Sequence, residues 1–452
     1  MKLVSLLIIF TLFSNLFAQK IYRLNLEEAL KIASEQNLQL KEKRFKIKIA
    51  ENKLEQVKRS YFLPILTLRN ASGFVPGVDA IRIDSINYAY ANKSEDSYSD
   101  WGPFTDFKVE ALQPIFTFGK LSGLKNAAKA NIKVQSFDFQ SEKIDILYDV
   151  KKYYWSYLLA SELVELSNDT QKKIKEAKKK VEDKLEEGLG EVTQADLFKI
   201  KLRETEVKEK VRQAETAKIL SLEVLKLTLG INYSDSLFLE DEKLASVKFE
   251  KSDLNILIEK SFQSRADFQQ LKFGIQAKKF LLEEARSEFF PQFFIGAEYK
   301  FNKTPGRDDI DNPFLVDNSN FNSYKAVIGF KQNLGFHVSS KKVEKAKFEY
   351  QELLAKEKYS KEGIKLEVKK AFLEAEDLRL TVRELSRMTK MTSGWYKTTA
   401  SDYDLGLGEL KELVEAFSAK VETEQKYLDT VYKFNLAIAK LEKVSGIELI
   451  KY

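Results

Sequence analysis

The sequence predicts a mixed α/β membrane protein made of two copies of one unit, in which a pair of strands is combined with long helices. The segment Arg59–Pro64 recurs as Arg286–Pro291, 227 residues later, each time at the end of a charged, helix-like stretch. Gly-Leu-Gly-Glu occurs at 188–191 and again at 406–409. All seven prolines lie in two short windows at matching points of this repeat. The chain is therefore a duplication of one long unit.

The N-terminus has the pattern of a secretory signal. Lys2 is followed by an apolar run, Leu3–Phe13, and then by small or polar residues up to Ala18. We therefore expect residues 1–18 to be a signal peptide and the mature chain to begin near Gln19. No later stretch reaches the roughly 18 apolar residues that a transmembrane helix needs, so we expect export without helical spans.

The composition argues against several classes of site. The chain has no cysteine, which excludes disulfides and thiolate metal sites, and it has one histidine. Its 74 basic and 68 acidic residues form a mixed surface, so no nucleic-acid partner is expected. Aspartates cluster in the predicted loops without the spacing of a calcium-binding loop, so neither a metal nor a cofactor is expected. No nucleotide-binding or nucleophile motif is present, and we predict that the protein is not an enzyme.

Long helices are predicted from the scarcity of glycine and proline. The 64 residues from 124 to 187 contain neither, and as one helix they would extend about 96 Å. Asn25, with Glu28 three residues later, has the spacing of a capping box, so a helix should begin there. Lys178–Lys180 is interpreted as a solvated helix face.

The last predicted helix, within 409–445, carries two apolar stripes. One stripe has alternating steps of three and four, as in a coiled coil, and comprises Leu410, Val414, Phe417, Val421, Leu428, Val431 and Ile438. The other repeats at multiples of seven and comprises Leu413, Tyr427, Phe434 and Leu441. Two stripes predict neighbours on both sides, as in the wall of a cylinder, and an ordinary helical bundle is the alternative.

Strands are predicted where the apolar period changes to two. In 292–301 the odd positions are apolar or aromatic, while the other face includes Glu298 and Lys300, and 324–331 alternates in the same way. The first repeat has its equivalents at 65–70 and 107–116, and the segments 73–105 and 302–322 are predicted loops. Strands of about ten residues with one apolar and one polar face are typical of outer-membrane β-barrels.

The predicted domains follow the repeat. They are a signal peptide, 1–18; a first repeat, 19–230; an equatorial linker, 231–253; a second repeat, 254–445; and a C-terminal tail, 446–452. Four strands cannot close a barrel, and lipid tolerates no open strand edge, so the chain should oligomerise in the membrane. Glu298 and Lys300 would then face a wet lumen, which predicts a conduit.

These features resemble the TolC-like outer-membrane efflux family. The resemblance rests on the Leu24–Leu30 helix start, the Phe-Leu-Pro and Phe-Phe-Pro strand entries, the Phe118–Lys120 exit and the paired Gly-Leu turns. It implies a homotrimer whose chains each give four strands to one outer-membrane β-barrel, continued by a coiled-coil α-barrel through the periplasm. It also implies a passive exit duct of a tripartite efflux or type I secretion system, working with a periplasmic membrane-fusion adaptor and an inner-membrane pump. Drugs, metals and proteins are all possible cargo of such a duct.

The resemblance also implies two functional regions. Gly188, Leu189, Gly406 and Leu407 would form the periplasmic tip where the adaptor docks. Tyr403, Glu412 and Glu415 would form the periplasmic gate, and the i, i+3 spacing puts both carboxylates on one helix face. Gly408 stands where the family's gate has an arginine, so a salt-bridge latch is not expected there.

Two rival functions remain from the sequence. A periplasmic adaptor is also rich in helical hairpins, but it should have one hairpin between β-rich domains. A structural coiled-coil protein of the envelope would not need the apolar face of residues 292–301.

Overall fold

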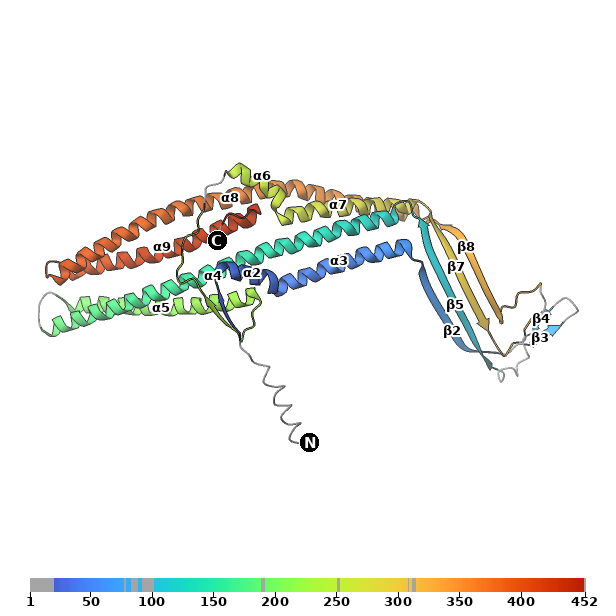
Figure 1. The fold of residues 1–452 in the computed structure, drawn as a ribbon, viewed down its shortest axis with the longest axis horizontal. Helices are drawn as coiled ribbons and strands as arrows, with labels where there is room; N and C mark the ends of the chain where they lie inside the picture. Colours follow the sequence, from blue (N-terminus) through green and yellow to red (C-terminus); the bar gives the residue numbers. More distant parts are fainter. Residues whose placement is uncertain are drawn as a thin grey trace, which may run out of the picture. The chain divides into compact units, whose positions relative to one another are not determined.

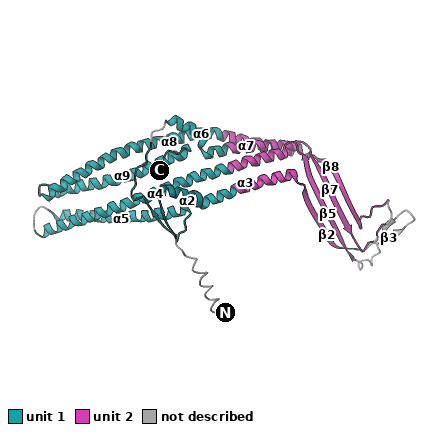
Figure 2. Ribbon diagram, in the orientation of Figure 1, with its two compact units in different colours: residues 1–46, 135–271, 356–452 teal, residues 47–134, 272–355 magenta. Residues whose placement is uncertain are grey.

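The computed structural model describes residues 20–76, 79–82, 88–91, 101–187, 192–249, 253–307, 309–310 and 314–450. The predicted signal peptide and the Gly188–Leu189 turn lie outside these residues. The chain divides into two compact units (Figure 2). The helical unit comprises Met1–Lys46, Gln135–Leu271 and Lys356–Tyr452, and the sheet unit comprises Ile47–Val134 and Lys272–Ala355.

The sheet unit contains one antiparallel sheet of four strands in the order β2-β5-β7-β8 (Figure 1). The strands are β2 (Ile65–Pro76), β5 (Trp101–Phe116), β7 (Gln292–Lys303) and β8 (Phe321–Lys331). The first two come from the first repeat and the last two from the second, and β5 pairs with β7 to join them. The four strands predicted from the sequence are therefore present, and β2 and β8 are the edges.

The strands of the first repeat are longer than expected. β2 continues to Pro76 and β5 already begins at Trp101, so both strands extend into the segment 73–105 that the sequence analysis assigned to a loop. The same segment holds a short antiparallel pair, β3 (Asp79–Arg82) and β4 (Tyr88–Ala91). The alternation fails at Ser72 and Gly73, but pairing compensates, because the Ser72 and Thr105 hydroxyls lie 2.9 Å apart. Strand pairing thus extends beyond the apolar pattern.

Eight α-helices are assigned within the described residues. They are α2 (Leu26–Gln36), α3 (Leu38–Phe62), α4 (Lys120–Glu186), α5 (Gln194–Leu229), α6 (Leu254–Ser264), α7 (Ala266–Arg286), α8 (Phe336–Asp404) and α9 (Leu410–Ser445). A short 3-10 turn, η2 (Ser287–Phe289), follows α7. The capping box predicted at the start of α2 is confirmed, because the Glu28 amide donates to Asn25 Oδ1 at 2.9 Å and the Asn25 amide donates to Glu28 Oε2 at 3.1 Å.

The core of the helical unit forms where α4, α5, α8 and α9 meet. Its fully buried side chains include Tyr154 and Val150 of α4, Leu225 of α5 and Val368 of α8. Both stripes predicted on α9 are buried or half-buried along the helix, and burial is deepest in its second half. The helix therefore has neighbours on two sides, as the sequence predicted.

Segments of the predicted linker and tail lie against these helices. β1 (Ile21–Leu24) pairs in parallel with β6 (Ser236–Leu239) inside the linker 231–253. The tail is held by Glu442 of α9, whose Oε1 accepts hydrogen bonds from the Leu449 and Ile450 amides at 2.7 Å each. The other oxygen of Glu442 lies 2.5 Å from Lys151 Nζ of α4. One buried carboxylate therefore joins the tail, α9 and α4.

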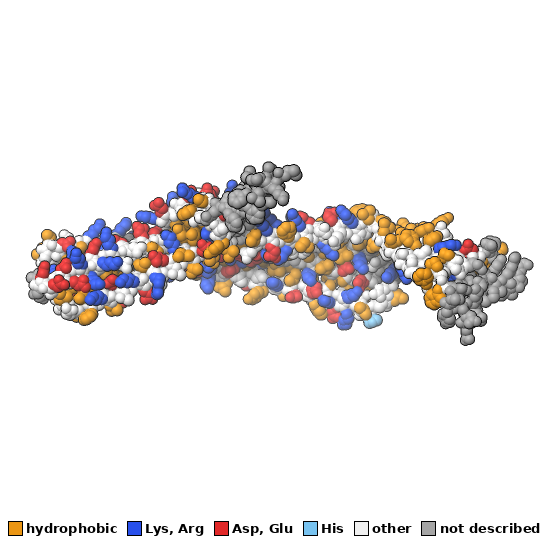
Figure 3. All heavy atoms as spheres, turned by 90° about the horizontal axis from the view of Figure 1, so that it is seen from below, with side chains coloured by type: hydrophobic (Ala, Val, Ile, Leu, Met, Phe, Trp, Pro, Cys, Tyr) orange, Lys and Arg blue, Asp and Glu red, His pale blue; other side chains and the backbone are white. Residues whose placement is uncertain are grey.

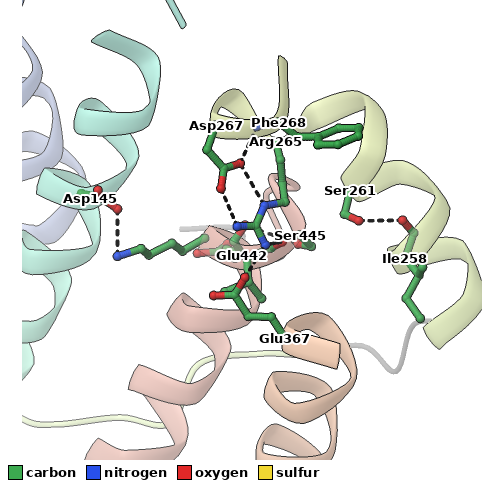
Figure 4. Close-up of polar contacts among 11 residues, drawn as sticks. Asp145, Ile258, Ser261, Arg265, Asp267, Phe268, Glu367, Glu442 and Ser445 are labelled. Carbon is green, nitrogen blue, oxygen red and sulfur yellow. Dashed lines mark hydrogen bonds and ion pairs between the residues drawn. The ribbon is translucent and has the colours of Figure 1, made fainter. Parts of the chain in front are cut away.

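A second polar cluster surrounds Arg265, between α6 and α7 (Figure 4). Its guanidinium donates to both oxygens of Asp267 at 3.0 and 2.6 Å, to Glu367 of α8 at 2.6 Å and to the Val444 carbonyl of α9 at 3.1 Å. Burial favours a raised pKa for Asp267, but the charge and hydrogen bonds of Arg265 outweigh it and lower the pKa. The cluster ties the α6–α7 corner to the α8–α9 hairpin.

Replacing Arg265 with methionine is expected to lower the free energy of unfolding of the helical unit by about 2 kcal/mol, because several charge-assisted hydrogen bonds are lost together. Arg379→Met is the matched control, since Arg379 pairs with Glu376 three residues away on its own helix, and such pairs contribute little. Thermal denaturation followed by the helical circular dichroism signal compares the two variants. Equal losses in both would show that the Arg265 cluster does not fasten the corner.

Candidate functional site

One face of the sheet is lined by charged side chains in register across the strands. Glu298 of β7 lies opposite Glu110 of β5 and Lys325 of β8. Its two carboxylate oxygens lie 2.9 Å from Lys108 Nζ and 3.0 Å from Lys325 Nζ. This ion-pair chain crosses three strands, and the sequence could not predict its partners because they depend on register.

Lys300 lies on the same face, two residues further along β7. Its Nζ is 3.8 Å from an oxygen of Asp106 and 5.0 Å from the centre of the Phe321 ring. In register it stands beside Lys108 of β5, which itself stands beside Arg69 of β2. Glu298 and Lys300 are thus brought together on one polar sheet face, as expected, and their place in a lumen remains a prediction.

The opposite face of the sheet is apolar and exposed. Register places the odd residues of β7 beside the even residues of β8, so that Tyr299 meets Tyr324 and Ile295 meets Ile328. Tyr324 and Ile328 are 85% and 79% exposed. The apolar side chains of this face are Leu66, Leu68, Phe107, Val109, Ala111, Phe293, Ile295, Ala297, Tyr299, Phe301, Tyr324, Ala326, Ile328 and Phe330. A contiguous exposed patch of this kind marks a surface that is covered by lipid or another chain.

The helices show a different surface. Acidic and basic side chains are interspersed over them, as expected from the composition (Figure 3). None of the helices within the described residues has both the length and the apolarity to cross a membrane.

The predicted gate residues lie where α8 turns into α9. Tyr403 is in the last turn of α8, and Lys184 Nζ of α4 lies 5.2 Å from the centre of its ring. The Tyr403 hydroxyl is buried and has no hydrogen-bond partner among the described residues. Gly406 has a φ of +75°, in the left-handed region that glycine tolerates best. Leu405 and Leu407 are exposed, so the turn presents an apolar tip.

The structure explains why no side chain occupies position 408. A Cβ added to Gly408 would lie 3.1 Å from the Tyr403 amide nitrogen and 3.2 Å from Asp402 Cβ. The amides of Leu407 and Gly408 both donate to the Asp402 carbonyl, which draws the turn closed. A side chain at this position would require these neighbours to shift by a few tenths of an ångström, and glycine itself provides no side chain for a salt-bridge latch.

Glu412 and Glu415 lie in the first two turns of α9 and are both exposed. They share one helix face, as the spacing predicted. Carboxylates in this position are favoured by the partial positive charge of the helix N-terminus. Neither side chain has an ion pair with another described residue, so both are available to a partner or to solvent.

Three lysines of α4, which we call the lysine ladder, contact the α8–α9 hairpin. Lys173 Nζ lies 5.3 and 5.7 Å from the ring centres of Tyr396 and Phe417. Further along, Lys180 Nζ is 3.4 Å from Asp404 Oδ1, and Lys184 covers Tyr403. The ladder therefore joins the two helical hairpins at three levels near their turns.

The structure refines the expectation for Lys178–Lys180. Lys179 and Lys180 are exposed, as expected, and Lys180 also pairs with Asp404; Lys178 is half-buried and pairs with Glu204 of α5 at 3.1 Å. Lys208 and Lys178 together lower the pKa of Glu204. Sequence reasoning missed these pairs because the partners are 26 and 224 residues away. For the cation–π contacts of the lysine ladder, the available signal in the sequence was the set of aromatic residues at 396, 403 and 417.

Comparison with solved structures identifies the fold. The Campylobacter jejuni CmeC outer-membrane channel is 17% identical with a TM-score of 0.75, covering 95% of this chain and 87% of that one. The Neisseria gonorrhoeae MtrE outer-membrane channel in its open state is 14% identical with a TM-score of 0.74, covering 94% and 90%. The outer-membrane channel OprN is 13% identical with a TM-score of 0.74, covering 94% and 90%. No protein-family model and no curated protein matches the chain.

The predicted resemblance to TolC-like outer-membrane channels is thereby confirmed for the fold. The likeness extends over nearly the whole chain, and the four-stranded sheet and long helices are shared. Because fold does not determine function, the role of the chain is argued from its own surfaces.

Proposed function

We propose that this protein is the outer-membrane exit channel of a tripartite efflux or type I secretion system. The observation that carries the proposal is the four-stranded sheet, which has one exposed apolar face, one charged face and two unpaired edges. An open edge cannot persist in lipid. Three copies would supply twelve strands and close the sheet, with the apolar face toward lipid and Glu298 and Lys300 toward a wet lumen.

In this proposal the sheet lies in the outer membrane and the long helices extend into the periplasm as a passive duct. A periplasmic adaptor docks at the Gly406–Leu407 tip together with the Gly188–Leu189 turn, and an inner-membrane pump drives transport. The similarity to known channels supports this role. A periplasmic adaptor or a structural coiled coil would leave the exposed apolar face of the sheet without a partner.

The proposal is tested by two measurements on the full chain. The mass of the detergent-solubilised protein should be that of a trimer, and its insertion into a planar bilayer should produce discrete conductance steps. A stable monomer that keeps its strands and does not conduct would contradict the channel.

We further predict that Glu412 and Glu415 form an acidic ring at the periplasmic mouth of the trimer. Replacing both with alanine should weaken cation selectivity and block by multivalent cations added on the periplasmic side, because six carboxylates would be lost from a narrow space. Bilayer recordings with asymmetric salt measure the selectivity. The control is Glu422→Ala, an exposed glutamate further along α9, which should leave it unchanged. Unaltered selectivity in the double variant would remove these residues from the gate.

A further inference from the structure

α8 carries an apolar stripe that no other part of the described chain covers. Leu366, Leu373, Met391 and Trp395 are between 45% and 73% exposed. Their spacing of 7, 18 and 4 residues keeps them on one face of a helix with 3.6 residues per turn. The exposed side chains Phe348, Tyr359, Leu380 and Met388 lie on the same face. A stripe of this length on a charged helix indicates a contact with another helix.

α5 carries a second uncovered stripe. Phe198, Leu202, Leu220 and Leu227 are between 59% and 73% exposed. The buried side chains of this helix, among them Leu197 and Leu225, belong to the core of the unit and lie on a different face. α5 therefore also lacks a partner on one side.

The two stripes match in reverse order. Along α5 the exposed residues are separated by 4, 18 and 7 residues, and along α8 they are separated by 7, 18 and 4. One antiparallel register consequently aligns Phe198 with Trp395, Leu202 with Met391, Leu220 with Leu373 and Leu227 with Leu366. Shifting the register by one heptad in either direction places at least one of these four α5 residues opposite a polar residue of α8.

The directions of the helices fit this register. α5 begins, and α8 ends, at the same end of the helical unit, because Leu410 beyond α8 packs against the cluster of Val192, Leu197 and Ile200 at the start of α5. Copies related by rotation about an axis along the helices would thus place α5 and α8 of neighbours antiparallel.

We infer that α5 of one copy packs against α8 of the next copy along this seam. The inference rests on the proposed homotrimer and names the side chains that hold its helical part together. The two surfaces are different, so each contact is head-to-tail, and repetition by rotation closes a ring in which every copy uses both surfaces. The occupant of each stripe is therefore a second copy of this chain.

Gly363 gives independent support. It lies inside α8, where glycine costs about 1 kcal/mol relative to alanine, and a Cβ added there would meet nothing within 4 Å. No contact with another described residue accounts for it. It falls three residues before Leu366 on the exposed face, and the register places it opposite Gly230, which ends α5. Gly230 is already required within the chain, because a Cβ there would lie 2.7 Å from the Gln36 carbonyl oxygen, so the support comes from Gly363 alone.

The middle of the seam is not apolar on both sides. Between the apolar pairs at its two ends, the register brings Glu209 of α5 opposite Glu384 of α8, and both are on the stripe faces. The exposed Leu380 and Met388 of α8 fall in the same interval, opposite the polar residues Gln213 and Thr205 of α5. The seam thus has an apolar contact at each end, and these two contacts are the ones to test.

Engineered cysteine pairs test the register, because the chain contains no cysteine of its own. The matched pairs are Leu202→Cys with Met391→Cys, and Leu220→Cys with Leu373→Cys. The mismatched pair is Leu202→Cys with Leu373→Cys, whose positions the register separates by 18 residues, or about 27 Å. Disulfides need Cα atoms within about 7 Å. Under oxidation the matched pairs should give covalently linked dimers and trimers on a denaturing gel, and the mismatched pair should give single chains.

Co-expression of the Leu202→Cys and Met391→Cys single variants proves that a link joins two chains, since it should yield linked dimers that neither variant forms alone. A trimer in detergent without links at the matched pairs would overturn this seam and leave the proposed channel standing. A protein that forms no oligomer at all would instead contradict the proposed trimer itself. Linking in the mismatched pair would also overturn the register.

Discussion

Replacing Glu442 with alanine is expected to lower the free energy of unfolding of the helical unit by about 3 kcal/mol. The carboxylate is buried, accepts hydrogen bonds from two backbone amides of the tail and neutralises Lys151 of α4. Removing one partner of a buried ion pair takes away compensation for the charge of the other, and the Leu449 and Ile450 amides lose their acceptor. Chemical denaturation followed by circular dichroism measures the loss.

Two variants make the Glu442 result specific. Glu448→Ala changes an exposed glutamate of the same tail and should have little effect. Glu442→Gln keeps an acceptor for the amides but removes the charge. Its loss of unfolding free energy should therefore be smaller than that of Glu442→Ala and larger than that of Glu448→Ala. Hydrogen exchange at Leu449 and Ile450 should speed up in Glu442→Ala. If Glu442→Ala is as stable as Glu448→Ala, this carboxylate does not hold the tail.

Removing the aromatic contacts of the lysine ladder is expected to favour the open channel. Lys173 and Lys184 lie over the rings of Tyr396, Phe417 and Tyr403, and each cation–π contact contributes about 1 kcal/mol. If these contacts exist only while the two hairpins lie together, losing all three should shift the open-to-closed ratio about 150-fold. Single-channel recording of the Lys173→Met, Lys184→Met double variant measures the open probability.

The matched control for the ladder is Lys179→Met, which removes an exposed lysine from the same helix between the two positions. It should behave like the unchanged protein. Lys173→Arg combined with Lys184→Met should be closed for more of the time than the double variant with two methionines, because a guanidinium also packs on aromatic faces. An unchanged open probability in the double variant would falsify the ladder as a closing device, while the channel proposal would remain.

The elements of this fold follow from short-range patterns. Asn25 and Glu28 mark a helix start because a capping box involves four consecutive residues. The absence of glycine and proline from 124 to 187 predicts most of α4, and the alternation in 292–301 predicts β7 and its two faces. Strand ends were less predictable, since Gly73 and Ser72 are held in β2 by pairing with β5.

The candidate site likewise has features that the sequence predicted and contacts that it could not predict. The sequence placed Glu412 and Glu415 on one helix face and Glu298 and Lys300 on one strand face, because neighbours along a helix or strand have fixed directions. It could not predict that Lys184 covers Tyr403, or that Asp402 and Tyr403 closely approach the position of a Cβ at Gly408. These contacts depend on how the hairpins pack.

The sequence by itself determined the duplication, which is visible in segments repeated 227 residues apart. It also determined the long helices, the four strands and the polarity of each face, because each of these is set by residues a few positions apart. The tertiary structure decided the partners: Lys108 and Lys325 for Glu298, and Lys151 and the tail amides for Glu442. It also decided which apolar side chains of α5 and α8 stay exposed. Partners from distant segments depend on strand register and helix packing, which are properties of the whole folded chain and leave no periodic signal along it.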